Sequence, residues 1–304
     1  MNYRDIIKSR DLRVKVLSYL NWVPDSIMLR LQYWLQTGRK LNLKNPKRFT
    51  EKLQLYKMKY RNPDMLRCTD KYEVRKYIEE KGFGEYLIPL IGVYNNVEEI
   101  DYVKLPNKFV AKTTDGGGGN QVLICKDKQT LSEETFKTRL RTWMSARKVK
   151  KQAGREWAYE NNYPRRIIIE EFIGYENIKK DLCDYKFFCF NGKVEYIYGL
   201  SDRNLGQSVQ LGVYNRKFEK LDVSRNDERP QDKPLSKPLN FDKMISLAEI
   251  LSKDFPHVRV DLYNIAGNIY FGELTFYDGS GYMTFNPDSF DEEMGMKFDI
   301  NSFV

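Results

Sequence analysis

The chain has 304 residues, of which 41% are hydrophobic and 31% are charged, a composition typical of a folded globular protein. Its 51 Lys and Arg residues exceed the 42 Asp and Glu residues and give a net charge of +9, which favours anionic partners such as nucleotides, acidic sugars or membrane headgroups. Basic residues occur along the whole chain without the pattern of a nucleic-acid-binding module, which argues against nucleic acid as a partner. Charged residues interrupt every apolar stretch, so we expect neither a signal peptide nor a transmembrane helix, and a cytoplasmic location.

Cysteine and histidine give no sign of a metal centre. The four cysteines lack Cys-x-x-Cys spacing, and the single histidine, His257, excludes a poly-histidine site. Scattered thiols suit a reducing compartment. His257 follows a proline, and we expect a structural role for it rather than a catalytic one. Any catalytic metal should therefore be held by oxygen ligands, which favours Mg²⁺ or Mn²⁺.

The first 35 residues predict amphipathic helices, because apolar positions between residues 14 and 35 are flanked by Lys and Arg. Such helices could pack against the body of the protein or contact a membrane surface, and both interpretations stay open. Helical spacing next predicts helices over residues 49–59 and 71–81, with Thr50 and either Thr69 or Asp70 as N-caps.

An apolar run, a lysine and four glycines follow at residues 109–119. The run predicts a strand that ends near Lys112, and the glycines leave backbone amides free to approach an anion. With the charge of Lys112 beside them, a phosphate-binding loop is one interpretation, and a glycine-rich hairpin turn is the other. The spacing fits neither the Walker A loop nor the dinucleotide-binding loop.

Strands predominate in the middle of the chain. They are predicted for residues 105–112, 122–125, 166–172, 185–190 and 193–199, the last two forming a hairpin around an Asn-Gly turn. The basic run at residues 139–151 is interpreted as a solvated helix face or a mobile loop, or else as a clamp for an acidic acceptor. A polar stretch at residues 222–238 predicts a loop, and residues 241–251 predict a helix.

A second predicted hairpin joins residues 258–263 to residues 268–274. Alternation places Arg259 and Asp261 on one face of its first strand, and Glu273 and Thr275 on one face of its second. Two carboxylates beside an arginine suit a magnesium ion that bridges nucleotide phosphates. A cross-strand salt bridge in an ordinary sheet would use the same residues.

These motifs, in this order, resemble the ATP-grasp superfamily. They comprise Lys71 in Thr-Asp-Lys-Tyr-Glu-Val-Arg, Lys112 before the glycines, Ile-Ile-Ile-Glu-Glu-Phe-Ile at 167–173, and Arg259-x-Asp261 with Glu273. In finer detail, Phe-Thr-Glu-Lys-Leu at 49–53, Asp-Tyr-Lys-Phe at 184–187 and Gly-Glu-Leu-Thr-Phe at 272–276 resemble the TupA-like ATP-grasp family of teichuronopeptide and surface-polysaccharide loci. The resemblance runs from about residue 44 to the end of the chain.

The resemblance implies an α+β ATP-grasp fold, in which two lobes grip ATP, and a role for each matching residue. Lys71 and Lys112 would contact the ATP phosphates beneath a glycine-rich lid, and Arg259 would stabilise the oxyanion of a tetrahedral intermediate. Asp261 and Glu273 would bind magnesium. The other implied contacts with ATP come from the lid, the adenine hinge and two further side chains: Gly116, Gly117, Gly118, Gly119, Glu170, Glu171, Phe172, Ile173, Glu176 and Lys186. Arg203 would lie near the acceptor substrate.

Two positions depart from the family pattern. Thr275 stands where many superfamily members have the asparagine of Glu-x-Asn, and as a third metal ligand it offers only a neutral hydroxyl. Asp115 stands where the TupA-like pattern often has a histidine. A basic role therefore does not transfer to that position.

The activity implied by the resemblance is an ATP- and Mg²⁺-dependent ligase that joins a carboxylate to an amine through an acyl phosphate. The expected substrates are an amino acid and a uronic acid of a surface polysaccharide or its precursor. A glycosyltransferase or an ATP-dependent kinase is the alternative, although the Asp-x-Asp motif usual in glycosyltransferases does not occur in the chain.

Four segments are expected along the chain. They are a helical N-terminal extension (1–45), an N-terminal α/β lobe (46–108), a central lobe with the glycine-rich lid (109–175) and a C-terminal lobe with the metal site (176–304). Through the first of these segments, the protein could make peripheral contact with the inner face of the membrane.

Overall fold

The computed structural model describes residues 19–117, 121–145, 154–160, 163–174, 183–201, 209–301 and 303. Among them are seven α-helices: α3 (Asp25–Thr37), α4 (Phe49–Lys59), α5 (Pro63–Thr69), α6 (Glu73–Glu80), α7 (Glu133–Ser145), α8 (Phe241–Ser252) and α9 (Ser289–Lys297). The strands that pair with one another are β1 (Leu90–Tyr94), β2 (Phe109–Thr113), β3 (Val122–Cys125), β4 (Ile167–Glu171), β5 (Asp184–Phe190), β6 (Lys193–Ser201), β7 (Gln210–Asn215), β8 (Ser224–Arg225), β9 (Arg229–Pro230), β10 (His257–Ile265), β11 (Asn268–Thr275) and β12 (Phe285–Asn286). None of the described helices is long and apolar enough to cross a membrane.

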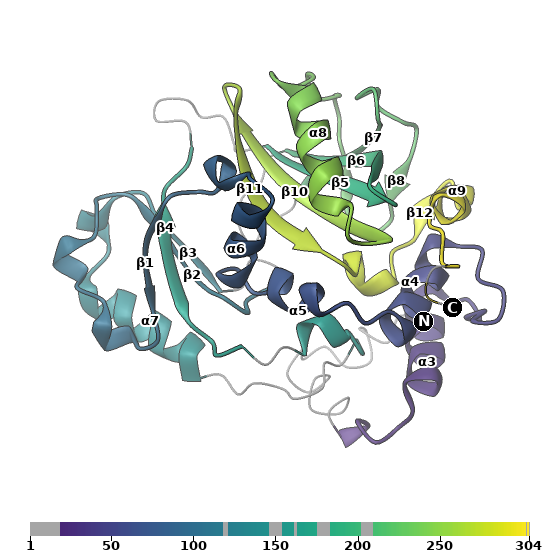
Figure 1. Ribbon diagram of the computed structural model, residues 1–304, viewed down its shortest axis with the longest axis horizontal. Coiled ribbons are helices and arrows are strands. Elements are labelled where there is room, and N and C mark those ends of the chain that lie inside the picture. Colours follow the sequence, from purple (N-terminus) through teal and green to yellow (C-terminus); the bar gives the residue numbers. More distant parts are fainter. Residues whose placement is uncertain are drawn as a thin grey trace.

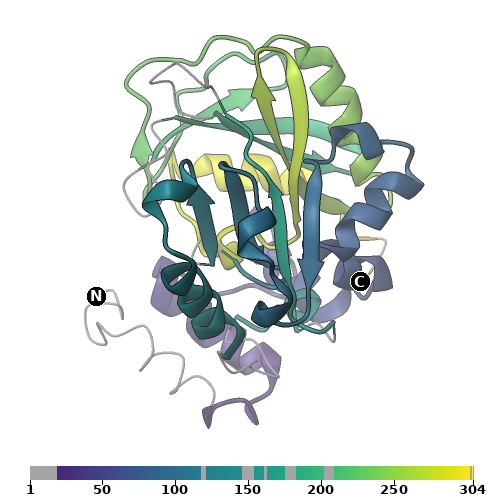
Figure 2. The same cartoon turned by 90° about the vertical axis from the view of Figure 1, so that its left-hand side faces the viewer.

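Two main sheets occupy opposite halves of the molecule, with α5 and α6 between them (Figure 1). The smaller sheet has the strand order β1-β4-β2-β3 and lies in front of the larger one in Figure 2. Phe109 and Ile169 of this sheet share a hydrophobic core with Phe136 and Leu140 of α7. Because side chains alternate along a strand, Lys112 and Glu170 lie on the opposite face of the sheet.

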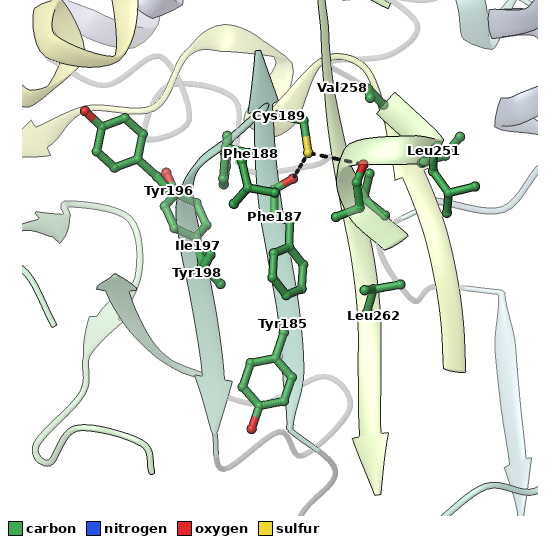
Figure 3. Packing of buried hydrophobic residues seen from close by; sticks show 14 of the residues in the cluster. Tyr185, Phe187, Phe188, Cys189, Tyr196, Ile197, Tyr198, Leu251, Val258 and Leu262 are labelled. Atoms are coloured by element: carbon green, nitrogen blue, oxygen red, sulfur yellow. Dashed lines mark hydrogen bonds between the residues drawn. The ribbon is translucent and has the colours of Figure 1, made fainter. Parts of the chain in front are cut away.

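The larger sheet has the strand order β11-β10-β5-β6-β7-β9, and α8 covers one of its faces. Figure 3 shows the packing on this sheet, where the buried thiol of Cys189 lies 3.6 Å from the Phe187 carbonyl oxygen and 3.7 Å from that of Ala248. Val260 and Leu262 of β10 are fully buried in this core. Alternation then places Arg259 and Asp261 on the other face.

A β-bulge in β11 changes which side chains face the core. Asp261 pairs with Glu273, but its neighbour Leu262 pairs with Phe271, so Gly272 is an extra residue between the two pairs. Phe271 can therefore point into the core while Glu273 points away from it. A Cβ atom at Gly272 would lie only 3.0 Å from the Asp261 carbonyl oxygen, which explains the glycine at this position.

Most predicted elements are confirmed, and the structure also differs from the prediction in several places. Helix α4 has the predicted bounds, but Thr50 lies inside it and donates its hydroxyl to Asp291 at 2.7 Å instead of capping the helix. Asp70 does accept the backbone amides of Tyr72 and Glu73, at 2.9 and 3.0 Å, as expected for a residue at a helix start. The α-helices and strands that were not predicted from the sequence are α5, α9, β1, β7, β8, β9, β12 and the first half of α7.

Candidate active site

Arg259 is the centre of a charged cluster on the larger sheet. Its guanidinium contacts both carboxylate oxygens of Asp261 at 2.7 Å, Glu273 at 3.2 Å and the hydroxyl of Thr275 at 3.0 Å. It also pairs with Asp278, which follows β11. These contacts hold the guanidinium from several sides, although the side chain is 9% exposed. Arg259 therefore presents a fixed positive charge beside two acidic strand residues.

Lys186 joins this cluster from the neighbouring strand β5. Its position pairs with Asp261 across the ladder, and its ammonium group contacts the carboxylates of Asp261 and Asp184, the latter at 2.8 Å. Burial alone lowers the pKa of Lys186, but the two carboxylates outweigh it and raise the pKa above its usual range. Burial also raises the pKa of Asp261, against the opposing effect of Arg259 and Lys186.

Glu273 lies directly opposite Asp261 and is the more accessible of the two carboxylates. Its side chain is 47% exposed, against 2% for Asp261. The pKa of Glu273 falls to about 2, because the charges of Lys186, Arg259 and Lys71 together outweigh the effect of burial. Glu273 is thus ionised at neutral pH, as a ligand for a cation must be.

The carboxylates of Asp261 and Glu273 are suited to bind a magnesium ion. Two carboxylates on facing strands match the one or two protein ligands that Mg²⁺ takes when substrate phosphates and water supply the rest. Among the described residues, no group of three or more His, Cys, Asp or Glu side chains could hold a metal ion alone. The pair Asp261 and Glu273 therefore suits a metal that arrives with a nucleotide.

The smaller sheet contributes a second cluster. Lys112 of β2 pairs with Glu170 of β4 at 2.6 Å, and Arg75 of α6 reaches the same carboxylate at 3.3 Å. Lys112 and Glu170 are half-buried and buried, respectively. The lysine predicted to contact phosphate and the acidic residue predicted in the adenine hinge are therefore in direct contact.

Lys71 connects the two clusters. Its backbone amide donates to the Thr114 carbonyl oxygen at 2.9 Å, and its ammonium group donates to the carbonyl oxygen of Gly116. Burial is the main cause that lowers the pKa of Lys71, while the charge of Glu273 opposes this shift and that of Lys112 adds to it. Lys71 thus interacts electrostatically with Glu273 of the larger sheet and with Lys112 of the smaller sheet.

The loop after β2 is fixed at its base. Asp115 accepts a forked hydrogen bond from the Nε–H group of Arg165, with Nε 2.9 Å from both carboxylate oxygens, so Asp115 has a structural partner. Gly116 and Gly117 are described, whereas Gly118 and Gly119 lie outside the described residues, as do Glu176 and Arg203. In the predicted hinge, the backbone amide of Glu171 donates to the Pro89 carbonyl oxygen at 3.0 Å. Phe172 and Ile173 follow it and are both partly exposed.

Two acidic residues of the site were missed from the sequence. Asp278 contacts Arg259 and also Arg225, the latter at 3.3 Å, and Asp184 contacts Lys186. Asp184 lies two residues before Lys186, a spacing that places both on one face of a strand and could have indicated the contact. Asp278 lies three residues after the end of β11, where the alternation of side chains along a strand no longer predicts which way a residue faces.

His257 has the structural role that was expected. Its ring is fully buried, packs against Phe49 and Phe190 with centroid distances of 5.0 and 4.7 Å, and places Nδ1 2.9 Å from the Cys189 carbonyl oxygen. Burial lowers the pKa of His257 to about 4. The ring is enclosed by aromatic side chains and stays neutral at physiological pH, although alternation along β10 places it on the same face as Arg259.

Comparison with known protein families identifies a family for the chain. The sequence profile of the TupA-like ATP-grasp family matches residues 51–299. No curated protein matches the chain. Among solved structures, the chain is similar to the D-alanine–D-alanine ligase of Bacillus anthracis, with 18% identity over 69% of this chain and 57% of that one, and a TM-score of 0.40.

Two further solved structures are similar at the same level. The D-alanine–D-alanine ligase of Helicobacter pylori has 15% identity over 76% of this chain and 61% of that one, with a TM-score of 0.42. The ATP-grasp ligase PsnB, in complex with a minimal precursor, has 12% identity over 71% of this chain and 55% of that one, with a TM-score of 0.40. The chain spans 55% to 61% of the length of these three proteins. Because the family profile covers most of its length, the chain belongs to the TupA-like ATP-grasp family.

Proposed function

We propose that the protein is an ATP- and Mg²⁺-dependent ligase that joins a carboxylate to an amine through an acyl phosphate, with release of ADP and phosphate. The observation that carries this proposal is the placement of Arg259, Asp261 and Glu273 on one hairpin face within electrostatic reach of Lys71. Such an arrangement concentrates positive charge and metal-ligand oxygens where a phosphoryl group could be transferred.

Each lysine would exchange a protein partner for a phosphate. Lys112 would leave Glu170, which keeps Arg75 as a partner, and Lys71 would leave the carbonyl oxygen of Gly116. Gly116 to Gly119 would then close over the phosphates, while Glu170 to Ile173 would hold the adenine and Glu176 the ribose. Lys186 would contribute a further positive charge to the phosphates.

Asp261 and Glu273 would hold the magnesium ion, with Thr275 beside them. The ion would neutralise phosphate charge during transfer. In the structure, Lys186 and Arg259 contact the oxygens of Asp261. Lys186 therefore supplies positive charge to this carboxylate and would turn toward the phosphates when the ion binds.

The chemistry requires charge stabilisation rather than a protein nucleophile. A free carboxylate does not react with an amine, because oxide would have to leave; after phosphorylation, the leaving group is phosphate. The amine then attacks the carbonyl carbon, and the negative charge on the carbonyl oxygen needs a fixed cation. Arg259, held by Asp261 and Asp278, is suited to this role.

The finer substrate proposal is an amino acid joined to a uronic acid of a surface polysaccharide or its precursor, with Arg203 near the acceptor. We place the reaction in the cytoplasm, at the inner face of the membrane. The division into segments 1–45, 46–108, 109–175 and 176–304 remains part of the same proposal.

An oxygen-transfer experiment tests the proposal. The protein is incubated with ATP, Mg²⁺, an amino-acid mixture and a uronic acid whose carboxylate carries ¹⁸O, and the released phosphate is analysed by mass spectrometry. A ligase moves one ¹⁸O atom from the carboxylate into phosphate for each amide formed. If the label appears only when the amino acid carries it, the amino acid supplies the carboxylate. ADP and amide without labelled phosphate from either substrate would contradict the acyl phosphate.

The same experiment separates the alternatives. A kinase would leave a stable phosphorylated sugar and no free phosphate, and a glycosyltransferase would consume a sugar nucleotide instead of ATP. Lys112→Ala and Glu273→Gln are the matched variants. Undiminished ATP turnover in both folded variants would rule out the proposed site.

A further inference from the structure

Large apolar side chains are exposed at the N-terminal end of the described chain. Tyr19 and Trp22 are each 81% exposed, and Ile27, Leu31 and Trp34 of α3 are 56%, 45% and 55% exposed. Aromatic and aliphatic residues of this size are normally buried, and neighbouring exposed ones usually mark an interaction surface. We call these five residues the N-terminal apolar surface.

Helix α3 has two apolar faces. Met28, Leu29 and Tyr33 are buried against the body, where the Tyr33 hydroxyl lies 2.8 Å from that of Thr50. Ile27, Leu31 and Trp34 recur with spacings of four and three residues, which places them together on the outer face. One face of α3 thus packs against the body, as the first interpretation of the N-terminal helices predicts, and the other face remains exposed.

The backbone beneath this surface is anchored. Arg155, which is 4% exposed, donates from its guanidinium to the carbonyl oxygens of Leu20, Asn21 and Val23 at 2.8, 3.4 and 3.4 Å. A buried arginine thus fixes the turn that carries Trp22. The exposure of Trp22 is consequently a feature of an ordered turn.

The net charge of the protein is concentrated in the same region. Residues 1–50 contain 11 Lys and Arg and 3 Asp and Glu, which is +8 of the total of +9. Between Asp25 and Glu51 there are six basic residues and no acidic one. The excess of positive charge thus lies in this part of the sequence. In the structure, Arg39 and Arg48 pair with acidic residues at the start of α9, namely Asp288, Asp291 and Glu292, whereas Arg30, Lys40, Lys44 and Lys47 are exposed. This distribution weakens the link between the overall charge and an acidic acceptor in the proposed active site.

We infer that the N-terminal apolar surface, with the exposed basic residues Arg30, Lys40, Lys44 and Lys47 that follow in the sequence, docks the protein onto an anionic lipid bilayer. Tryptophan and tyrosine favour the boundary between headgroups and acyl chains, and Lys and Arg are attracted to anionic headgroups. A second copy of the chain is a poorer occupant, because it would bring the same +8 charge to the contact. Residues 1–18 are also a poorer occupant, since five basic and two acidic residues give them the same sign of charge. The inference deepens the proposed location at the inner face of the membrane, and it does not depend on the ligase chemistry.

Vesicle binding by the full-length protein tests the inference. Co-sedimentation is measured with vesicles of phosphatidylcholine alone and of phosphatidylcholine mixed with phosphatidylglycerol. We expect binding to the anionic vesicles only, and its loss as salt is raised. The triple variant Trp22→Ser/Leu31→Ser/Trp34→Ser should bind at least about tenfold more weakly.

Matched controls use exposed apolar residues elsewhere on the surface. Val103 and Leu239 are 79% and 66% exposed, so Val103→Ser/Leu239→Ser removes exposed aliphatic side chains without touching α3. This control should bind vesicles like the parent protein, and both variants should keep the parent melting temperature within a few degrees, because the substituted side chains are exposed.

Three results would overturn the inference. They are equal binding to both vesicle types, unchanged binding of the triple variant, or a parent protein that dimerises through this surface and ignores vesicles. A fourth contrary result would be stronger vesicle binding after removal of residues 1–18, because that would identify those residues as the cover of the surface.

Discussion

The two sides of the candidate site are held in different ways. On the larger sheet, Arg259 is fixed by side chains from β10, β11 and the following turn, among them Asp261 and Asp278. On the other side, Lys112 pairs with Glu170, and Lys71 contacts a carbonyl oxygen in the glycine-rich loop. The first arrangement suits a charge that must be in place before the reaction, and the second suits groups that change partners when a nucleotide binds.

The largest effect should come from replacing Arg259, which its neighbours hold in place on the larger sheet. Arg259→Met leaves the buried carboxylates of Asp261 and Asp278 without their main cation, which we expect to destabilise the fold by about 3–5 kcal/mol. Activity should fall on the order of a thousandfold, because a preorganised cation is lost. Urea denaturation measures the first effect and the rate of amide formation the second.

A companion variant separates folding from chemistry. Asp278→Asn keeps Arg259 and the size of the site, so it should retain more stability than Arg259→Met. If the arginine variant folded with full stability and full activity, Arg259 would have neither of the roles assigned to it.

The next effect concerns the pH dependence of stability, through a histidine on β10, the strand that also carries Arg259. His257 begins β10, and its pKa is lowered to about 4 by burial, whereas in the unfolded chain it is about 6.5. Between these values the unfolded chain binds the extra proton, so stability rises with pH from 4 to 6.5 and is independent of this group above 6.5. The parent should therefore lose about 3 kcal/mol more than His257→Gln between pH 7 and pH 4.

Urea denaturation at several pH values measures this difference. Other titrating groups change equally in both proteins and cancel in the comparison. Parallel stability profiles for the parent and His257→Gln would mean that the buried ring does not resist protonation.

A smaller effect is expected on the smaller sheet, where Lys112 is proposed to exchange Glu170 for a phosphate. Lys112→Met should weaken ATP binding about 10- to 100-fold, or roughly 1.4–2.8 kcal/mol, with little loss of stability because Glu170 keeps its contact with Arg75. Calorimetric titration with ATP and Mg²⁺ provides the affinity. Lys108→Met, on the loop before the same strand, is the control for loss of a positive charge. Equal ATP affinity in the parent and Lys112→Met would remove Lys112 from the phosphate site.

The sequence predicted the family and the order of its motifs, because these depend on residue types and on strand alternation. Asp261 and Glu273 were expected on facing strands, and they pair directly. The β-bulge at Gly272 was not predicted, although it decides that Glu273 faces the site while Phe271 faces the core. A bulge depends on which residues pair across the ladder, and one strand alone does not contain that information.

Contacts between distant segments were the other limit. Thr50 had the residue type of an N-cap, but its hydroxyl bonds to Asp291, which is 241 residues away in the chain. Asp278 also escaped prediction, because a turn after β11 brings it to Arg259. The pairing of Lys112 with Glu170 joins two motifs that the sequence presented separately. Each case involves a tertiary contact that outweighs a local preference.

The smallest effect concerns Thr275, whose hydroxyl contacts both Arg259 and Glu273. Its hydroxyl is 3.0 Å from Arg259 and 3.2 Å from Glu273, so it can orient both groups or serve as a weak metal ligand. Thr275→Val keeps the shape and removes the hydroxyl, and it should raise the Mg²⁺ concentration at half-maximal activity by about fivefold, or about 1 kcal/mol. Thr275→Asn supplies an amide oxygen and should lower that concentration instead. If both variants kept the parent's Mg²⁺ dependence but lost stability, Thr275 would act only by orienting Arg259 and Glu273, and the metal would rest on the two carboxylates alone.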